Sequence, residues 1–116
     1  MKTSTDPRHK HRQNLIQELF KVDFHDQSTK PEIKIILQNK EQLDLQIQKA
    51  APEFPIDKIN KIDLAILRLA VYELLIEKTE PANVIIDEAI ELAKEFANDT
   101  SPAFINGALG NILKNE

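Results

Sequence analysis

The chain has 116 residues, 41% hydrophobic and 29% charged, a composition ordinary for one globular domain with a modest core. It contains no cysteine, which excludes disulfides and thiolate metal sites. No apolar run approaches the roughly 20 residues that cross a bilayer. None at the N-terminus resembles a signal peptide, so we expect a cytoplasmic protein with no membrane partner.

The formal net charge of −4 hides a basic N-terminal tip. Within the first 12 residues a single acidic residue, Asp6, faces four basic ones, which are Lys2, Arg8, Lys10 and Arg12. The rest of the chain is acidic. A basic tip on an acidic body is typical of an arm that meets an anionic partner, although a solvated, mobile terminus has the same composition.

The first predicted helix begins at Pro7, after a flexible lead-in over residues 1–6 whose last residue, Asp6, is a good N-cap. It runs to Phe20 or a little beyond. Its C-terminal half carries apolar residues on one face, namely Leu15, Ile16, Leu19 and Phe20. The first turns carry the basic residues instead. We therefore expect the C-terminal half to anchor this helix and the N-terminal half to lie in solvent.

The remaining segments with a helical pattern follow in chain order: about 31–49, a short turn or helix within 56–62, about 64–77, about 82–97 and about 102–114. Asp63 is the expected cap of the segment 64–77. That segment is apolar on nearly all sides, so we expect it at the centre of the fold. The chain is thus predicted to be all-α, with residues 7–116 forming one compact helical bundle.

Three residues inside these helices require a structural explanation. Arg68 lies among apolar residues and must pair with an acid if it is buried. The candidate partners are Glu73, Asp87 and Glu88. Asn106 and Gly107 are poor helix formers. For them we expect a buried hydrogen bond from the Asn106 amide and a close approach of another helix at Gly107.

The basic run Arg8-His9-Lys10-His11-Arg12 is the strongest candidate for a functional site. Arg8 and Arg12 are four residues apart on one helical face, from which they can reach adjacent phosphates. Lys10 and the two imidazoles widen this surface, and a phosphate favours a charged histidine. The run therefore predicts an RNA-binding turn.

No catalytic motif accompanies this run. The chain has no Gly-rich phosphate loop, no HExxH and no GxSxG. His9 and His11 are two residues apart and point to different sides of a helix, which makes them a poor metal site. We therefore expect no enzymatic activity, no metal site and no cofactor.

Phe104, near the start of the last helix, has two interpretations. Its spacing from Ala108 and Ile112 fits packing in the core, whereas an aromatic side chain near a helix start can also stack a single-stranded base. The preceding Thr100 and Ser101 offer hydroxyls and helix N-terminal amides to a phosphate.

Three stretches in the second half of the chain resemble the NusB family of transcription antitermination proteins. They are residues 62–74 (IDLAILRLAVYEL), residues 81–96 (PANVIIDEAIELAKEF) and residues 101–109 (SPAFINGAL). The first helix, from Arg12 to the pair Leu19-Phe20, also resembles the start of the family.

The resemblance implies a fold of about five to seven helices in two packed sub-bundles. It also implies a transcription antitermination factor that binds a boxA-type single-stranded RNA together with the ribosomal protein NusE. By position, Arg8, Lys10 and Arg12 match the family's basic RNA-contacting turn. Phe104 and the Thr100-Ser101 loop match its second RNA-contacting region.

The chain also departs from the family pattern. His9 and His11 stand where family members often have more arginine, and Asp87 stands where asparagine is common. The stretch 21–55 looks short, with room for one good helix rather than two. A chain with one helix there would lack part of the surface that the family uses to bind NusE. The alternative function is therefore a protein-interaction module, or a homodimer, of the same fold without RNA recognition.

Overall fold

The computed structural model describes residues 6–25 and 30–115, and of residues 24 and 25 it describes the backbone alone. The predicted lead-in over 1–6 thus lies outside the described residues except for Asp6. The elements are α1 (Pro7–His25), α2 (Pro31–Gln38), α3 (Lys40–Ala50), the 3-10 turn η1 (Ile56–Lys58), α4 (Lys61–Tyr72), the π-helical turn η2 (Glu73–Glu77), α5 (Ala82–Phe96) and α6 (Ser101–Lys114). No strand occurs among the described residues, and the predicted all-α fold is confirmed.

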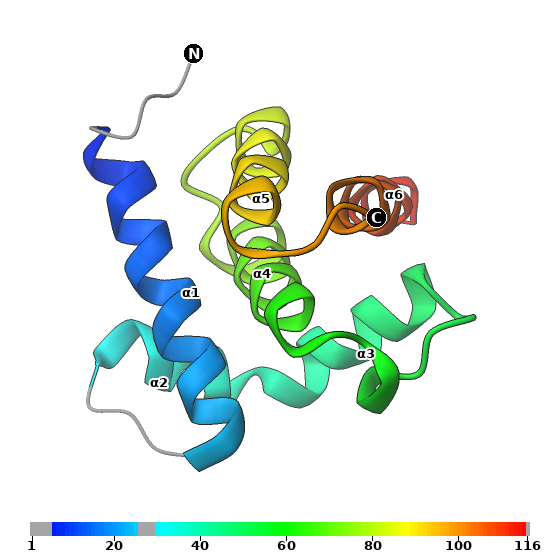
Figure 1. The fold of residues 1–116 in the computed structure, drawn as a ribbon, viewed down its shortest axis with the longest axis horizontal. Helices are drawn as coiled ribbons and strands as arrows, with labels where there is room; N and C mark the ends of the chain where they lie inside the picture. The colour runs from blue at the N-terminus through cyan, green and yellow to red at the C-terminus, as the bar shows by residue number, and fades with distance from the viewer. Residues whose placement is uncertain (1–5, 26–29, 116) are drawn as a thin grey trace.

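Helix α4 lies at the centre of the molecule, with α1 on one side and α6 on the other (Figure 1). It contacts α1, α3, α5 and α6, while α5 and α6 pack against each other. Helix α3 also contacts α6, and α2 contacts α1. Helix α4 thus joins a group formed by α1 and α2 to a group formed by α5 and α6.

The central position of α4 follows from its sequence. All its residues from Asp63 to Tyr72 are buried, because a helix that is apolar on nearly every side must be covered on every side. Its cap is Asn60, whose side chain accepts a hydrogen bond from the Ile62 amide at 2.9 Å. The prediction that Asp63 caps this helix is therefore wrong, since the helix begins two residues before it.

The predicted helix over 31–49 is in fact two helices, α2 and α3, separated at Asn39. The Asn39 amide nitrogen donates to the Ile36 carbonyl at 3.1 Å, and its side chain donates to the Ile35 carbonyl at 2.8 Å. An asparagine that bonds nearby backbone in this way competes with helix hydrogen bonds. The stretch 21–55 therefore holds two short helices after the end of α1, not the one predicted.

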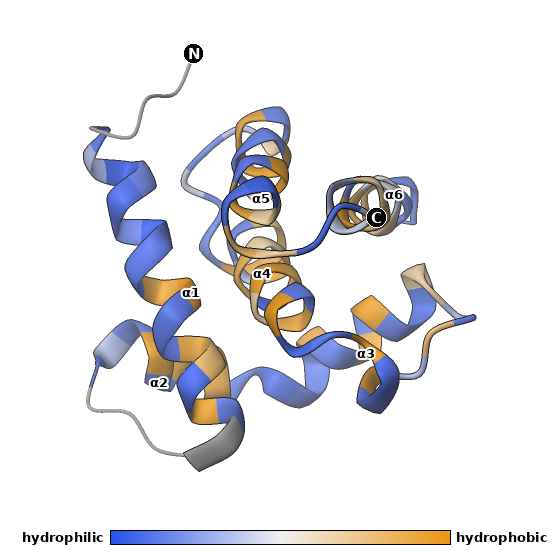
Figure 2. Ribbon diagram, in the orientation of Figure 1, coloured by the Kyte–Doolittle hydropathy of each residue, from blue (hydrophilic) through white to orange (hydrophobic). Residues whose placement is uncertain are grey.

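Both halves of helix α1 are anchored, contrary to prediction. Its C-terminal half buries apolar residues, which are Leu15, Ile16, Leu19 and Val22. Its N-terminal half is mainly hydrophilic (Figure 2) but nevertheless buries His9 and Arg12, which are 3% and 5% exposed. Phe20, predicted on the buried face, is 37% exposed. The apolar pattern alone could not reveal that α1 docks partly through charged groups.

The partners expected for Arg68 and the roles expected for Asn106 and Gly107 differ from those in the structure. Arg68 is buried, but its partners are Asp44 at 2.8 and 2.9 Å and Asp23 at 3.2 Å, from α3 and α1. Asn106 and Gly107 are exposed, and a Cβ placed on Gly107 would meet no atom within 4 Å. Neither a buried amide bond nor a close helix approach explains their presence in α6.

Candidate nucleic-acid interface

The first turns of α1 divide the predicted basic run into a buried and an exposed set. His9 and Arg12 are buried, whereas Arg8, Lys10 and His11 are exposed. Residues 9 and 12 are three apart and so face the same side of the helix. That side packs against acidic residues of η2, of α5 and of the loop between them.

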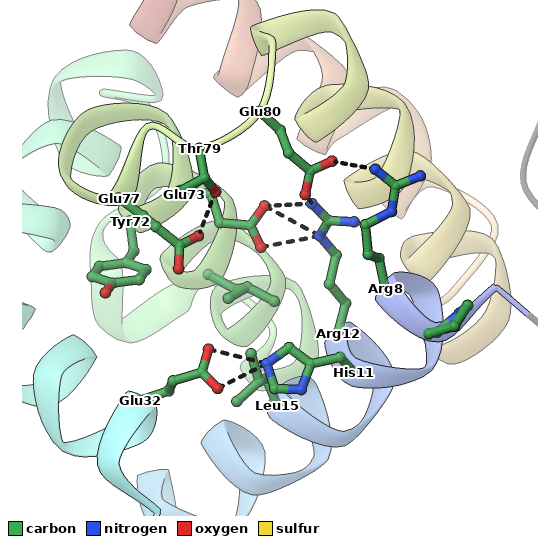
Figure 3. Close-up of a pocket in the computed structure, with 12 residues that line it drawn as sticks. Arg8, His11, Arg12, Leu15, Glu32, Tyr72, Glu73, Glu77, Thr79 and Glu80 are labelled. Carbon is green, nitrogen blue, oxygen red and sulfur yellow. Dashed lines mark hydrogen bonds and ion pairs between the residues drawn. The ribbon is translucent and has the colours of Figure 1, made fainter.

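Arg12 lies among three carboxylates. Its Nε and Nη2 donate to Glu73 at 2.8 to 3.1 Å, and its Nη2 also donates to Glu80 at 2.6 Å (Figure 3). Its Nη1 donates to Glu88 at 3.2 Å. Burial opposes the charge of Arg12, but Glu73 above all, then Glu80 and Glu88, outweigh it and raise the pKa of Arg12. Every nitrogen of the guanidinium is therefore engaged within the protein.

His9 lies between the carboxylates of Glu88 and Glu95, both on α5. Its Nδ1 is 3.0 Å from Glu88 Oε1, and its Nε2 is 2.9 Å from Glu95 Oε2. Burial favours the neutral ring, but hydrogen bonds to Glu88 and Glu95 outweigh it and raise the pKa of His9. Since a ring flanked by carboxylate oxygens must donate from both nitrogens, this geometry favours the imidazolium.

The exposed basic residues are held loosely. The Arg8 guanidinium, 69% exposed, is 3.6 Å from Asp6 and 3.7 Å from Glu80. His11 pairs with Glu32 at 2.8 Å, both partly exposed. Lys10 is exposed and has no ion-pair partner among residues 6–25 and 30–115. Exposed pairs of this kind are worth about 0–1 kcal/mol, so these side chains remain available to a phosphate.

A pocket of about 310 Å³ lies beneath these residues (Figure 3). Arg8, His11 and Arg12 line it, but so do four carboxylates, which are Glu32, Glu73, Glu77 and Glu80. Its acidic walls disfavour a phosphate inside the pocket. A nucleic acid would therefore meet the basic residues at the outer surface of α1.

The second predicted region lies where α6 begins, and its members differ in exposure. Thr100 is exposed, Phe104 is half-buried, and Ser101 is buried with its hydroxyl donating to Asn98 at 3.0 Å. Phe104 contacts the core on one side and meets Phe54 edge to face, with ring centroids 5.1 Å apart. Both interpretations of Phe104 thus have a structural basis.

Phe104 also borders a second pocket of about 310 Å³, which we call the Asp63 pocket. Its lining residues are Phe54, Lys58, Ile59, Asn60, Asp63, Asn98, Thr100 and Phe104. Asp63 is 7% exposed, and its Oδ1 is buried without a hydrogen-bond partner among the described residues. Burial raises the pKa of Asp63, with the Ser101 hydroxyl opposing this. Sequence reasoning missed the pocket because it assigned Asp63 to a helix cap.

An apolar groove of about 660 Å³ lies beside the Asp63 pocket, and Asn60 borders both. Residues of α1, of α4 and the segment preceding it, and of α5 form it: Gln17, Phe20, Lys21, Asn60, Ile62 and Phe96. Sequence reasoning missed the groove too, because periodicity placed Phe20 on the buried face of the first helix. The sequence alone does not distinguish a phenylalanine that will be exposed from one that will be buried.

Two kinds of feature are absent from the described part of the chain. No group of three or more histidine or acidic residues there could hold a metal ion. None of the helices there is long and apolar enough to cross a membrane.

Comparison with known proteins points to one family. A model described as the NusB family matches residues 33–114. The transcription antitermination protein NusB of Clostridium novyi (strain NT) is 46% identical over 79 residues, which cover 68% of this chain and 59% of the relative. That of Clostridium botulinum (strain Alaska E43 / Type E3) is 49% identical over 76 residues, covering 66% and 57%. The chain thus aligns with under two thirds of the length of these relatives.

Solved structures resemble the whole fold. T. maritima NusB superposes with a TM-score of 0.85 at 31% identity, covering 100% of this chain and 94% of that one. A structure described as antitermination factors NusB and NusE in complex with dsRNA superposes with a TM-score of 0.82, covering 94% and 97%. At 20% identity, the second likeness concerns the fold alone.

Proposed function

We propose, since this chain belongs to the NusB family, that it is a transcription antitermination factor that binds a boxA-type single-stranded RNA together with the ribosomal protein NusE. The proposal rests mainly on the solvent-exposed side of the first turns of α1. There Arg8, Lys10 and His11 are exposed next to a buried ionic cluster that fixes the helix.

The two sets of basic residues have different roles in this proposal. Arg8, Lys10 and His11 meet phosphates from the surface, and Thr100 and Phe104 offer a second contact at the start of α6. His9, Arg12 and Ser101 are buried, so they position the surface rather than touch the RNA. Three ionic contacts bind single strands weakly, which accords with a need for a second protein.

The apolar groove is the feature that favours a protein partner. It exposes Phe20 beside Phe96 and Ile62, and exposed aromatic side chains in a concave apolar surface are typical of protein interfaces. In the proposal this groove contributes to the contact with NusE. The second candidate function, a protein-interaction module or homodimer without RNA recognition, rests on the same groove.

The family is one of transcription factors, and we propose that this member likewise acts without catalysis, through binding alone. Its site of action is then the cytoplasm, where bacterial transcription takes place.

The test is binding of a fluorescent boxA-type RNA, and of a scrambled strand of equal length, with and without NusE. We expect the boxA-type strand to bind more tightly than the scrambled one when NusE is present. The double variant R8Q/K10Q is expected to weaken RNA binding about tenfold, because two phosphate contacts are lost.

The matched control is K34Q/K49Q, which removes the same charge from exposed positions on α2 and α3. It is expected to bind RNA as the wild type does. Equal binding of both strands under all conditions would contradict sequence-specific RNA recognition. If NusE then still bound, the interaction-module function would replace it.

A further inference from the structure

The pocket beneath the first turns of α1 has an excess of negative charge. We call it the acidic pocket after its four glutamates, which are Glu32, Glu73, Glu77 and Glu80. We propose that it binds an alkylammonium group, the chemistry shared by a free polyamine and the lysine side chain of a partner protein. The inference goes beyond the proposed RNA-binding function and does not depend on it.

Segments far apart in the sequence form the acidic pocket (Figure 3). They are the start of α1, the start of α2, and the stretch from the end of α4 through η2 to the loop before α5. In the π-helical turn η2 the Lys78 amide donates to the Glu73 carbonyl, five residues back, at 2.9 Å. Residues five apart therefore face nearly the same side of this turn, which brings Glu77 alongside Tyr72 at the pocket wall.

The basic residues of the pocket wall do not balance all of its carboxylates. Three of the glutamates pair with a basic residue of α1, namely Glu32, Glu73 and Glu80. Glu77 has no ion-pair partner among residues 6–25 and 30–115, and the hydrogen bond that it accepts from the Thr79 hydroxyl is 3.4 Å long. A positive group placed beside Glu77 would gain a charge partner there.

The feature that points to a ligand is the Tyr72 hydroxyl. Tyr72 is 7% exposed and lines the pocket, and its hydroxyl oxygen has accessible surface but no hydrogen-bond partner in the described part of the chain. Buried polar groups are normally hydrogen-bonded. Figure 3 shows the ring on the same side of the pocket as Glu77 and Glu32.

The neighbouring charges define the state of this hydroxyl. Burial raises the pKa of Tyr72, and Glu77, Glu32 and Glu73 raise it further. The group is therefore a neutral phenol, whose oxygen can accept a hydrogen bond from a donor in the pocket. A ligand that carries positively charged N–H donors would satisfy both this oxygen and the carboxylates around it.

The cation that fits is organic rather than metallic. No group of three or more histidine or acidic residues within the described ranges could hold a metal ion. A guanidinium is best bound by the two parallel oxygens of one carboxylate, whereas an ammonium donates in three directions. Tyr72, Glu77 and Glu32 offer acceptors from three different elements, which suits an ammonium.

Apolar side chains next to the carboxylates suit the carbon chain of such a ligand. They are Pro7, Leu15 and Leu69. The methylene groups of an alkylammonium bury apolar surface against walls of this kind while the charged end meets polar groups. At about 310 Å³ the pocket is within the range of small-ligand sites.

The experiment follows the chain alone by two-dimensional NMR during titration with spermidine, with Nα-acetyl-lysine methylamide and with butanol, which has no charge. We expect both amines to shift the amide signals of η2 and of the starts of α1 and α2. Butanol at the same concentration should leave these signals unchanged. The variants Y72F and E77Q should each weaken amine binding about fivefold or more, because a hydrogen bond to the ammonium is lost.

These variants leave the packing of the fold intact. Y72F removes a hydroxyl that has no partner in the described part of the chain, and Glu77 is exposed. The matched control is E41Q, which removes the same charge as E77Q from an exposed position of α3 outside the pocket. It should bind both amines as the wild type does.

R8Q tests the sign of the electrostatic contribution. Arg8 lines the pocket and is 69% exposed, so its positive charge repels an ammonium from the rim. R8Q should therefore bind both amines about twofold more tightly. Weaker binding by R8Q would overturn the inference, because the pocket would then favour an anion.

A separate arm distinguishes the two sources of the ammonium. NusE is added to the labelled chain without any amine. A shift of the same signals that is smaller in Y72F and E77Q assigns the pocket to a lysine of NusE. NusE binding that leaves these signals in place assigns it to a free polyamine, and either result supports the ammonium site.

Three results would overturn the inference. The first is the absence of a shift with either amine, and the second is an equal shift with butanol, which would show a pocket for carbon chains alone. The third is an equal loss of binding in E41Q and E77Q, since general attraction to the acidic body would then explain the shifts. Because RNA is absent, each of these results leaves the RNA-binding function standing.

Discussion

Arg12 illustrates how one buried charge can hold a helix in place. Its guanidinium meets Glu73, Glu80 and Glu88, which lie 61 to 76 residues further along the chain. Removal of one partner from a buried ionic cluster is costly because the remaining charges stay desolvated and uncompensated. We expect R12M to lower the free energy of unfolding by about 3–5 kcal/mol, measured by urea denaturation.

Arg8 provides the control for this prediction. It is an arginine on the same helix, but it is exposed and its ion pairs are long. R8M should change the free energy of unfolding by less than about 1 kcal/mol. Equal effects of the two substitutions would show that the cluster around Arg12 does not anchor α1.

The raised pKa of His9 predicts how the free energy of unfolding depends on pH. Its pKa in the folded protein is raised above the ordinary value of 6.5, so the folded state holds its proton more tightly than the unfolded state. The stability that this gives is fully present below pH 6.5 and is lost as the pH rises through the folded pKa. The stability difference between wild type and H9Q should therefore be largest below pH 6.5 and shrink as the pH rises above it.

The control for His9 is Q13A. Gln13 also donates to Glu95, at 3.1 Å, but it does not titrate. Its replacement should change the free energy of unfolding by a similar amount at every pH. A difference between wild type and H9Q that is constant with pH would contradict a charged His9 in the folded state.

Among the helices, α6 contains a glycine that lowers its stability. Gly107 lies in mid-helix, is exposed and would meet no atom within 4 Å if it carried a Cβ. An alanine restricts the unfolded chain and favours the helix, so we expect G107A to raise the free energy of unfolding by about 0.5–1 kcal/mol. Thermal or urea unfolding measures this. A loss of stability would show that another backbone packs at this position.

The elements were largely predictable, and the exceptions have a common physical origin. Periodicity located α1, α4, α5 and α6 to within a few residues, because their apolar positions repeat along the helix. The break at Asn39 was missed because it depends on a side-chain bond to backbone. The docking of the first α1 turns was missed because it depends on carboxylates distant in sequence.

The candidate site was predictable to a smaller extent. The sequence located the basic run of α1, but the choice between exposed Lys10 and buried Arg12 depends on which elements pack against the helix. The Asp63 pocket and the apolar groove involve several elements each, so no local pattern encodes them. Asp63 and Phe20 resemble ordinary helix residues until the fold brings their neighbours together.

At the scale of the whole molecule, the acidic body limits how strongly the protein can attract RNA. Three exposed basic residues at the start of α1 predict a slope of about −2 for log K against log salt with a single strand. A titration at several salt concentrations, without NusE, measures this slope. A value near −6 would require many more phosphate contacts than α1 offers.

The proposed function requires that the chain, NusE and RNA form one complex. Light scattering after size exclusion gives the mass of the chain alone, with NusE, and with NusE and a boxA-type strand. We expect all three to coelute at the summed mass of one copy of each. A chain that keeps its own mass in both mixtures would contradict it.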